Sequence, residues 1–174
     1  MIARTYRDLV DTCLEGPSGL LRILPSGTFE YRPSKQAIYC SNGATIHLYS
    51  AEKHESMRGP NLAWAWCDEL AAWDDIEPVW EQLMMATRVG DPRIFISTTP
   101  QPKDRVLALL DDAEKGTGVR LTTANSYQNR FLSSSWKEFI HGAFEGTRLG
   151  RQEIYAELLT DVPGALWSYA VVDG

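Results

Sequence analysis

The chain has 174 residues, of which 44% are hydrophobic and 23% are charged, and its formal net charge is −6 at pH 7. These values match an ordinary soluble globular protein that is long enough to bury one substantial core. The negative balance argues against a surface that is basic all round. Any contact with nucleic acid would therefore need a local basic patch or another part of an assembly.

The cysteines and the hydrophobic runs further restrict the class of protein that the sequence can encode. The sequence has three cysteines and no C-x-x-C pair, and we interpret them as reduced, partly buried thiols of a cytosolic protein: Cys13, Cys40 and Cys67. No run approaches the ~18 apolar residues of a membrane span, and the start of the chain has no signal-peptide pattern.

The opening residues are expected to end a strand and begin a helix. Residues 1–3 are a short apolar stretch that fits the end of a strand. Thr5 can cap the helix that follows, in which apolar residues recur at helical spacing until Gly16. A domain that starts at the end of a strand suggests a truncated chain or a start codon assigned too late.

Residues 37–50 predict a β-hairpin. Two runs of strand-forming residues, 37–41 and 44–50, flank Asn42-Gly43. An Asn-Gly pair tolerates the positive φ angles of a tight reverse turn, and the second arm alternates apolar and polar residues. We expect this hairpin to pair at or near the edge of a sheet.

The stretch Leu62–Leu70 organises the rest of the chain. It is an uncharged run with aromatic residues that ends on two adjacent acids, Asp68 and Glu69. Such a run predicts a strand buried on both faces, in the middle of a parallel sheet. Ligands of open α/β sheets bind at the carboxyl ends of these strands. At that position, an Asp can hold Mg²⁺ through the coordination shell of the ion, and a Glu can orient and deprotonate an attacking water. The alternative is a strand end closed by two solvated acids.

A helix and a second apolar strand are predicted next. Apolar residues at helical spacing between Trp73 and Met84 indicate a helix that packs into the core, with Pro78 in its first turn. Residues 93–97 form the strand, which ends in Thr98 and Thr99. Two hydroxyls at this position could sense a γ-phosphate, or the segment could be a loop exit closed by a proline.

The remaining elements continue the alternation. We expect a helix over 106–113, a strand over 119–123, a helix with a Ser135/Glu138 capping box and a buried apolar face, and a last helix over 147–159. Strands that alternate with helices at this spacing predict an α/β fold with a mostly parallel sheet. Pro163-Gly164 is expected to close the domain.

No G-x-x-x-x-G-K-[ST] run occurs anywhere in the 174 residues. The glycine-bearing turns at Gly16–Gly19 and Gly116–Gly118 lack the lysine that a phosphate cradle needs. If the protein is a nucleotide hydrolase, its phosphate-binding element is not part of this chain.

Taken together, the motifs resemble the large terminase subunit of tailed bacteriophages and prophages, the ATPase of the DNA-packaging motor. The matching stretches, in the family's order and spacing, are Arg58–Pro60, Trp66–Trp73, Ser97–Pro102, Gly146–Glu153 and Gly164–Trp167. The resemblance implies a three-layer RecA-like P-loop NTPase core. In this chain, its first strand, P-loop and following helix are expected to be absent. Residues 1–160 would be the partial ATPase domain and 161–174 the start of the linker to a nuclease domain.

The resemblance also implies roles for single residues. Asp68 would complete the Mg²⁺ shell, and Glu69 would be the general base for the lytic water. Arg58 would match the arginine that these motors insert into a neighbouring subunit's nucleotide site. Thr98 and Thr99 would lie in the segment that couples ATP hydrolysis to DNA movement.

The implied partners are double-stranded DNA, the portal protein, the small terminase subunit and further copies in a ring, in the cytoplasm of the bacterial host and without a membrane. ATP and Mg²⁺ are expected only together with the missing phosphate-binding loop, so the isolated chain should be inactive. Two alternatives remain open. One is a non-catalytic prophage remnant that acts as an interaction module. The other is a metal-dependent nuclease that uses Asp68, Glu69, Asp74 and Asp75.

Overall fold

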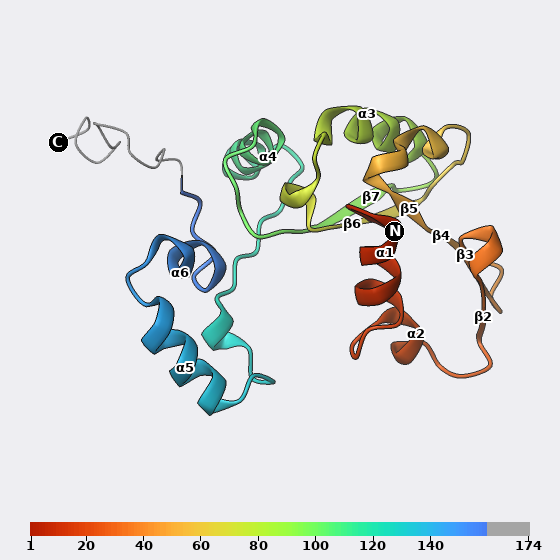
Figure 1. The fold of residues 1–174 in the computed structure, drawn as a ribbon. Helices are drawn as coiled ribbons and strands as arrows, with labels where there is room; N and C mark the ends of the chain where they lie inside the picture. Colours follow the sequence, from red (N-terminus) through yellow and green to blue (C-terminus); the bar gives the residue numbers. More distant parts are fainter. Residues whose placement is uncertain (160–174) are drawn as a thin grey trace. The chain divides into compact units, whose positions relative to one another are not determined.

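The computed structural model describes residues 1–159, which Figure 1 draws in colour. The chain forms two compact units, Met1–Thr98 and a second unit that begins at Thr99. The predicted linker over 161–174, with Pro163-Gly164, lies outside the described residues, so the boundary at 160 stays a prediction.

The first unit is built on a four-stranded sheet in the order β5-β1-β6-β7. These strands are β1 (Ile2–Ala3), β5 (Tyr49–Ser50), β6 (Trp64–Asp68) and β7 (Arg93–Ser97). Every pairing in this sheet is parallel. The register sets Ile2 opposite Cys67, and Asp68 opposite Ser97. The predicted α/β fold with a mostly parallel sheet is therefore confirmed.

One face of this sheet is covered by α3 (Ile76–Ala86), as Figure 1 shows. Side chains alternate along a strand, so Ala65 and Cys67 of β6 share this face, where both are buried. The helix contributes Val79 and Leu83, each 0% exposed, to the same layer. Pro78 lies in the first turn of α3, as predicted.

The other face of β6 corrects the prediction of a strand buried on both sides. Trp64 is 61% exposed, and Phe95 of β7, which the register sets opposite Trp66, is 51% exposed. Their rings lie 5.5 Å apart, centroid to centroid, and the guanidinium of Arg93 lies 6.0 Å from the Trp64 ring. An uncharged run does not reveal which of its faces a helix covers, and here only the face carrying Ala65 is covered along the whole strand.

The chain leaves β1 through α1 (Tyr6–Asp8), the π-helix η1 (Leu9–Leu14) and α2 (Leu20–Ile23). Thr5 caps α1 as predicted. Its hydroxyl accepts a hydrogen bond from the Asp8 N–H (3.0 Å), and the Asp8 carboxylate accepts one from the Thr5 N–H (3.2 Å). The π-turn was not predicted.

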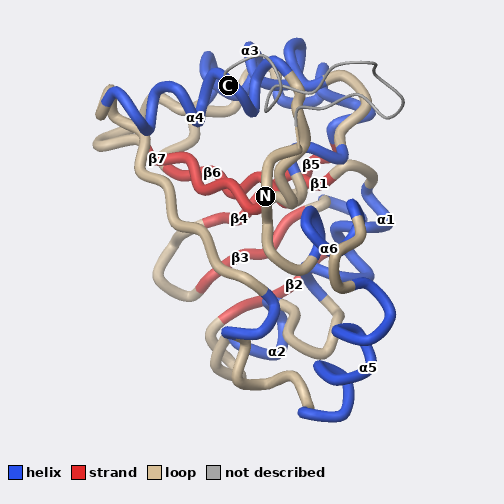
Figure 2. The backbone as a smooth tube through the Cα atoms, turned by 90° about the vertical axis from the view of Figure 1, so that its left-hand side faces the viewer, coloured by secondary structure: helices blue, strands red, loops and turns tan. Residues whose placement is uncertain are grey.

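A second, three-stranded antiparallel sheet holds β2 (Phe29–Arg32), β3 (Ala37–Cys40) and β4 (Thr45–His47), with the short 3₁₀ helix η2 (Pro33–Lys35) between the first two. The β3–β4 pair is the predicted hairpin, and Gly43 takes a φ of +86° in its turn. The hairpin belongs to this separate sheet, because its second arm divides at Leu48 and only β5 joins the parallel sheet. Between the antiparallel sheet and the N-terminal helices lies a core of Ala3, Leu9, Leu14, Ile38 and Leu48. Figure 2 shows both sheets from the side.

Two 3₁₀ helices flank β6. The first, η3 (Ala51–Met57), precedes it and packs against α3, and the second, η4 (Leu70–Ala72), follows it directly.

The second unit is helical in its described part. It contains α4 (Asp104–Lys115), the 3₁₀ turn η5 (Ser126–Gln128), α5 (Ser134–Phe144) and α6 (Arg148–Glu153). The strand predicted over 119–123 is wrong: within residues 1–159 the segment pairs with no strand and therefore has no ladder of hydrogen bonds. The helix predicted over 147–159 is shorter than expected, since α6 ends at Glu153.

The prediction for α5 needs two further corrections. Its N-cap is Ser133, whose hydroxyl accepts a hydrogen bond from the Trp136 N–H (3.2 Å), rather than Ser135. The face expected to be buried is open to solvent, with Phe139 69% and Trp136 38% exposed.

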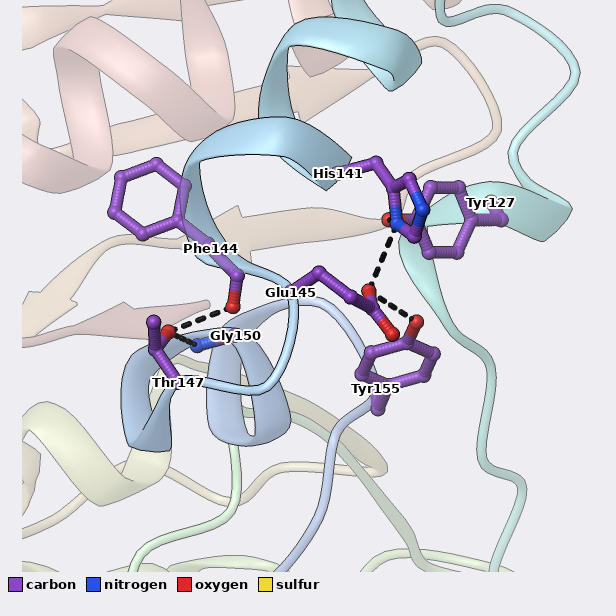
Figure 3. Close-up of polar contacts among 7 residues, drawn as sticks. All are labelled: Tyr127, His141, Phe144, Glu145, Thr147, Gly150 and Tyr155. Atoms are coloured by element: carbon purple, nitrogen blue, oxygen red, sulfur yellow. Dashed lines mark hydrogen bonds and ion pairs between the residues drawn. The ribbon is translucent and has the colours of Figure 1, made fainter.

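Polar contacts tie the end of α5 to its neighbours in this unit (Figure 3). The Glu145 carboxylate accepts a hydrogen bond from the Tyr155 hydroxyl (2.7 Å) and lies 2.9 Å from Nδ1 of His141. The Tyr127 hydroxyl lies 3.3 Å from the same nitrogen. In the part of the chain that the structure describes, no helix is long and apolar enough to span a bilayer.

Candidate functional site

The candidate site lies at the carboxyl end of β6, where the chain leaves the sheet. Asp68 is the last residue of the strand, and Glu69 follows it with a left-handed backbone (φ +50°, ψ +52°) before η4 begins. A residue other than glycine is uncommon in this conformation, which costs about 1–3 kcal/mol and is concentrated at functional sites. The turn bends the chain sharply directly after the two acids.

Neutral donors hold the two oxygens of the Asp68 carboxylate. Oδ1 accepts a hydrogen bond from the Ser97 hydroxyl (2.8 Å), and Oδ2 accepts one from the Cys13 thiol (3.2 Å). The Ser97 oxygen in turn accepts a hydrogen bond from the indole N–H of Trp66 (3.1 Å). Residues of β6, β7 and η1 therefore meet at this one carboxylate.

Hydrogen bonds hold the backbone both at Asp68 and just after Glu69. The indole N–H of Trp73, which is fully buried, donates to the backbone carbonyl of Asp68 (3.0 Å). The N–H of Ala71 donates to the Thr98 hydroxyl (2.9 Å), which joins the end of β7 to the turn after Glu69.

A hollow of about 280 Å³ opens beside the acids. It is lined by Arg4, Asp8, Thr12, Asp68, Glu69 and Ala72. The only basic side chain among them, Arg4, pairs with Asp74 (3.0 Å), and both side chains of this pair are largely exposed. Ligands of open α/β sheets bind at this end of the strands, so the hollow lies at the expected place.

Burial raises the pKa of the Cys13 thiol to about 12, and the hydrogen bond to Asp68 adds to the increase. The thiol therefore stays protonated near neutral pH and acts as a donor toward the carboxylate.

The donor set fits a magnesium ion that takes most of its ligands from elsewhere. Each carboxylate oxygen has two lone pairs, so the two bonds to Asp68 leave acceptor capacity for a cation. Within residues 1–159, no group of three or more His, Cys, Asp or Glu side chains is arranged to hold a metal ion. Mg²⁺ is commonly bound through one or two carboxylates, with substrate phosphates and water completing its octahedron.

The structure brings some of the predicted site residues together and separates others. Asp68 and Glu69 line one hollow, and Thr98 reaches the turn that follows them. Arg58 is an exposed residue after η3, before the amino end of β6, and does not line the hollow. Thr99 opens the second unit, where its hydroxyl lies 3.5 Å from the Glu153 carboxylate.

Three residues that contact the site, Cys13, Ser97 and Trp73, are not among the predicted site residues. Ser97 sits directly before the predicted threonine pair, and its position opposite Asp68 follows once β6 and β7 are paired in register. Cys13 lies 55 residues from Asp68 in the chain, and no spacing in the sequence indicates their contact.

This fold and site define an open α/β protein with paired acids at the carboxyl end of a central parallel strand. A family model described as "Terminase large subunit, T4likevirus-type, N-terminal" matches residues 1–170. The chain belongs to this family of large terminase subunits. Comparison of the sequence with curated proteins gives no significant match.

Solved structures of a large terminase share the fold. The chain is similar to the large terminase of a thermophilic bacteriophage, with a TM-score of 0.73 and 18% sequence identity over 90% of this chain. Another crystal form of that phage protein, in complex with ADP, gives a TM-score of 0.72 at the same identity and coverage. The chain spans 39% of the length of these proteins. At this identity, the likeness establishes the fold.

Proposed function

We propose that this chain is part of the ATPase motor of a viral DNA-packaging terminase, and that ATP hydrolysis takes place at the hollow beside Asp68 and Glu69. The observation that carries the proposal is that both acids line one hollow at the carboxyl end of a parallel strand. Membership of the large terminase family supports the packaging role. The ADP bound by the thermophilic phage protein supports a nucleotide as the ligand.

In this proposal, one of the two acids binds the metal ion and the other acts as the general base. Asp68 would hold Mg²⁺, and the ion would neutralise charge on the phosphates. Glu69 would orient a water molecule and accept its proton as the water oxygen forms a bond to the γ-phosphorus, while the bond from that phosphorus to the β–γ bridging oxygen breaks and ADP and inorganic phosphate are released. General-base catalysis of this kind contributes about 10²–10⁴-fold to the rate.

The other predicted residues act around this centre. Arg58 acts in the nucleotide site of a neighbouring copy in a ring, which fits its exposed position away from its own hollow. Thr98 and Thr99 couple hydrolysis to the movement of double-stranded DNA. The hydrogen bond from Ala71 to Thr98 supports this role, because it links the turn after Glu69 to the last residue of the first unit. The proposed partners are the portal protein and the small terminase subunit, in the cytoplasm of the bacterial host.

The decisive substitution is Glu69→Gln in a large terminase that contains this chain together with a phosphate-binding loop. The amide keeps the shape of the side chain but cannot accept a proton from water. We expect ATP hydrolysis to fall by at least about 10²-fold while nucleotide affinity, measured by fluorescence titration, is kept. Glu81→Gln, the same change at an exposed position on α3, is the matched control and should hydrolyse ATP normally. Unchanged hydrolysis, or loss of nucleotide binding, in Glu69→Gln would refute the role of Glu69 as a base.

The absence of a G-x-x-x-x-G-K-[ST] run favours the second candidate, an interaction module, for the 174-residue chain by itself. Phosphate binding in these folds needs backbone amides and a lysine. The isolated chain is therefore expected to show no ATP hydrolysis above background, and clear turnover would overturn this expectation. The nuclease alternative is not supported, because Asp74 pairs with Arg4 and neither Asp74 nor Asp75 lines the hollow.

A further inference from the structure

We infer that Cys13 is a positioning residue that, together with Ser97, fixes the orientation of the Asp68 carboxylate toward the hollow. The inference rests on the proposed function, since it concerns how Asp68 is prepared to hold a cation.

Hydrogen bonds from two sides fix the geometry of the Asp68 carboxylate. A carboxylate held by one hydrogen bond can still rotate about χ2, which is a broad torsion. Asp68 is held on both oxygens, by the Ser97 hydroxyl on Oδ1 (2.8 Å) and by the Cys13 thiol on Oδ2 (3.2 Å). The two donors come from different elements, β7 and η1, so together they fix the plane of the group.

The charge of the two donors also suits a cation-binding carboxylate. Both donors are neutral, so they orient Asp68 without cancelling the negative charge that attracts a cation. A lysine or arginine in either place would form an ion pair and compete with Mg²⁺. A thiol is also a weak donor, which leaves most of the electron density on Oδ2 available.

The local helix η1 places Cys13 at the sheet. In η1, the N–H of Glu15 donates to the carbonyl of Val10 (2.9 Å), a bond that spans five residues instead of four. This wide turn brings residues five apart nearer to one face, and Leu9 and Leu14 both enter the same core with 0% exposure. Cys13, one residue before Leu14, is left to contact the sheet at Asp68. π-turns of this kind frequently occur at functional sites.

The test compares two buried cysteines in a large terminase that contains this chain with a phosphate-binding loop. Cys13→Ala removes the donor to Asp68. Cys67→Ala removes the same atoms from a fully buried position one residue before Asp68, on the opposite face of β6. Mutation of a residue that hydrogen-bonds to a metal-binding group typically lowers the metal affinity 10–100-fold. We expect Cys13→Ala to raise the Mg²⁺ concentration for half-maximal ATP hydrolysis about tenfold, and Cys67→Ala to leave it unchanged.

Binding provides a readout that is independent of turnover. The affinity for ADP is measured by fluorescence titration with and without Mg²⁺. Cys13→Ala should lose most of the gain in affinity that Mg²⁺ provides, while its affinity for ADP without Mg²⁺ stays at the parent value. Cys13→Ser, which keeps a donor, should recover part of the gain. A purely structural role for Cys13 would lower both affinities together.

Folding is checked by the melting temperature of each variant. If Cys13→Ala does not fold, Cys13→Val takes its place, because it fills the volume of the thiol without providing a donor. The inference is overturned if the Mg²⁺ dependence of folded Cys13→Ala or Cys13→Val, which both lack the donor, matches that of Cys67→Ala. It is also overturned if kcat falls while the Mg²⁺ dependence stays unchanged. Failure of the proposed function gives a different pattern, namely a Glu69→Gln variant with full hydrolysis.

Discussion

Replacing Trp73 with phenylalanine should measure how strongly the end of β6 is held. Trp73 is 0% exposed, and its indole N–H donates to the carbonyl of Asp68 over 3.0 Å. Phenylalanine cannot donate, so the part-buried carbonyl of Asp68 loses this partner. Leaving a buried acceptor unsatisfied costs roughly 1–3 kcal/mol. The smaller ring adds about 1 kcal/mol for lost burial and the cavity that remains.

The expected loss in the free energy of unfolding is therefore roughly 2–4 kcal/mol, on the order of 10 °C in melting temperature for a chain of this size. Urea unfolding followed by far-ultraviolet circular dichroism measures it without relying on tryptophan fluorescence. Trp64→Phe is the matched control, because Trp64 is 61% exposed and lies on the same strand as Asp68. Its effect should stay within about 0.5 kcal/mol. Equal losses in the two variants would refute the argument that the buried indole holds the strand end.

Two further predictions concern titratable groups. Burial raises the pKa of Cys13 and of Cys67 to about 12, so both thiols stay protonated at pH 8 and lack the reactive thiolate. A colorimetric thiol reagent should therefore modify the half-buried Cys40 first and the other two only on unfolding; rapid reaction of all three would contradict this. The hydrogen bond from Tyr155 lowers the pKa of Glu145, which stabilises the folded state above the ordinary carboxyl pKa, and this stabilisation is lost as the pH falls through the lowered value. Tyr155→Phe should raise the Glu145 pKa measured by NMR and flatten the acid side of the stability curve, and an unmoved pKa would contradict the assignment.

Local signals predicted the parts of the fold that local chemistry decides. Asn42-Gly43 indicated the hairpin because few other residue pairs adopt the positive φ angles of a tight turn. Thr5 indicated a helix start because its hydroxyl can accept a hydrogen bond from the backbone N–H three residues later. The run from Leu62 to Leu70 predicted a strand because it is apolar and short. That run could not show that α3 covers only one face, since every uncharged residue looks equally fit for burial.

Predictions failed where the outcome depends on a distant partner. Residues 119–123 have the composition of a strand, but a strand also needs a neighbour to pair with. The apolar face of α5 has helical spacing, but spacing does not supply the element that would cover Phe139.

The residues of the candidate site also fall into those that local sequence predicts and those that only the fold brings together. Asp68 and Glu69 were found because they are adjacent and follow an apolar run. The thiol of Cys13 reaches Asp68 only through the wide turn of η1 and the pairing of β1 with β6.

The left-handed backbone at Glu69 has a consequence for mutational scanning of this position. Glycine, asparagine and aspartate adopt a φ near +50° with little or reduced penalty, whereas valine, isoleucine and threonine are strongly disfavoured there. A saturation library selected for soluble expression should therefore retain glycine and asparagine, neither of which can replace the carboxylate. Under the proposed function, the same library placed in a large terminase with a phosphate-binding loop and selected for ATP hydrolysis should retain glutamate. Comparison of the two selections separates what the main chain demands at this position from what the reaction demands.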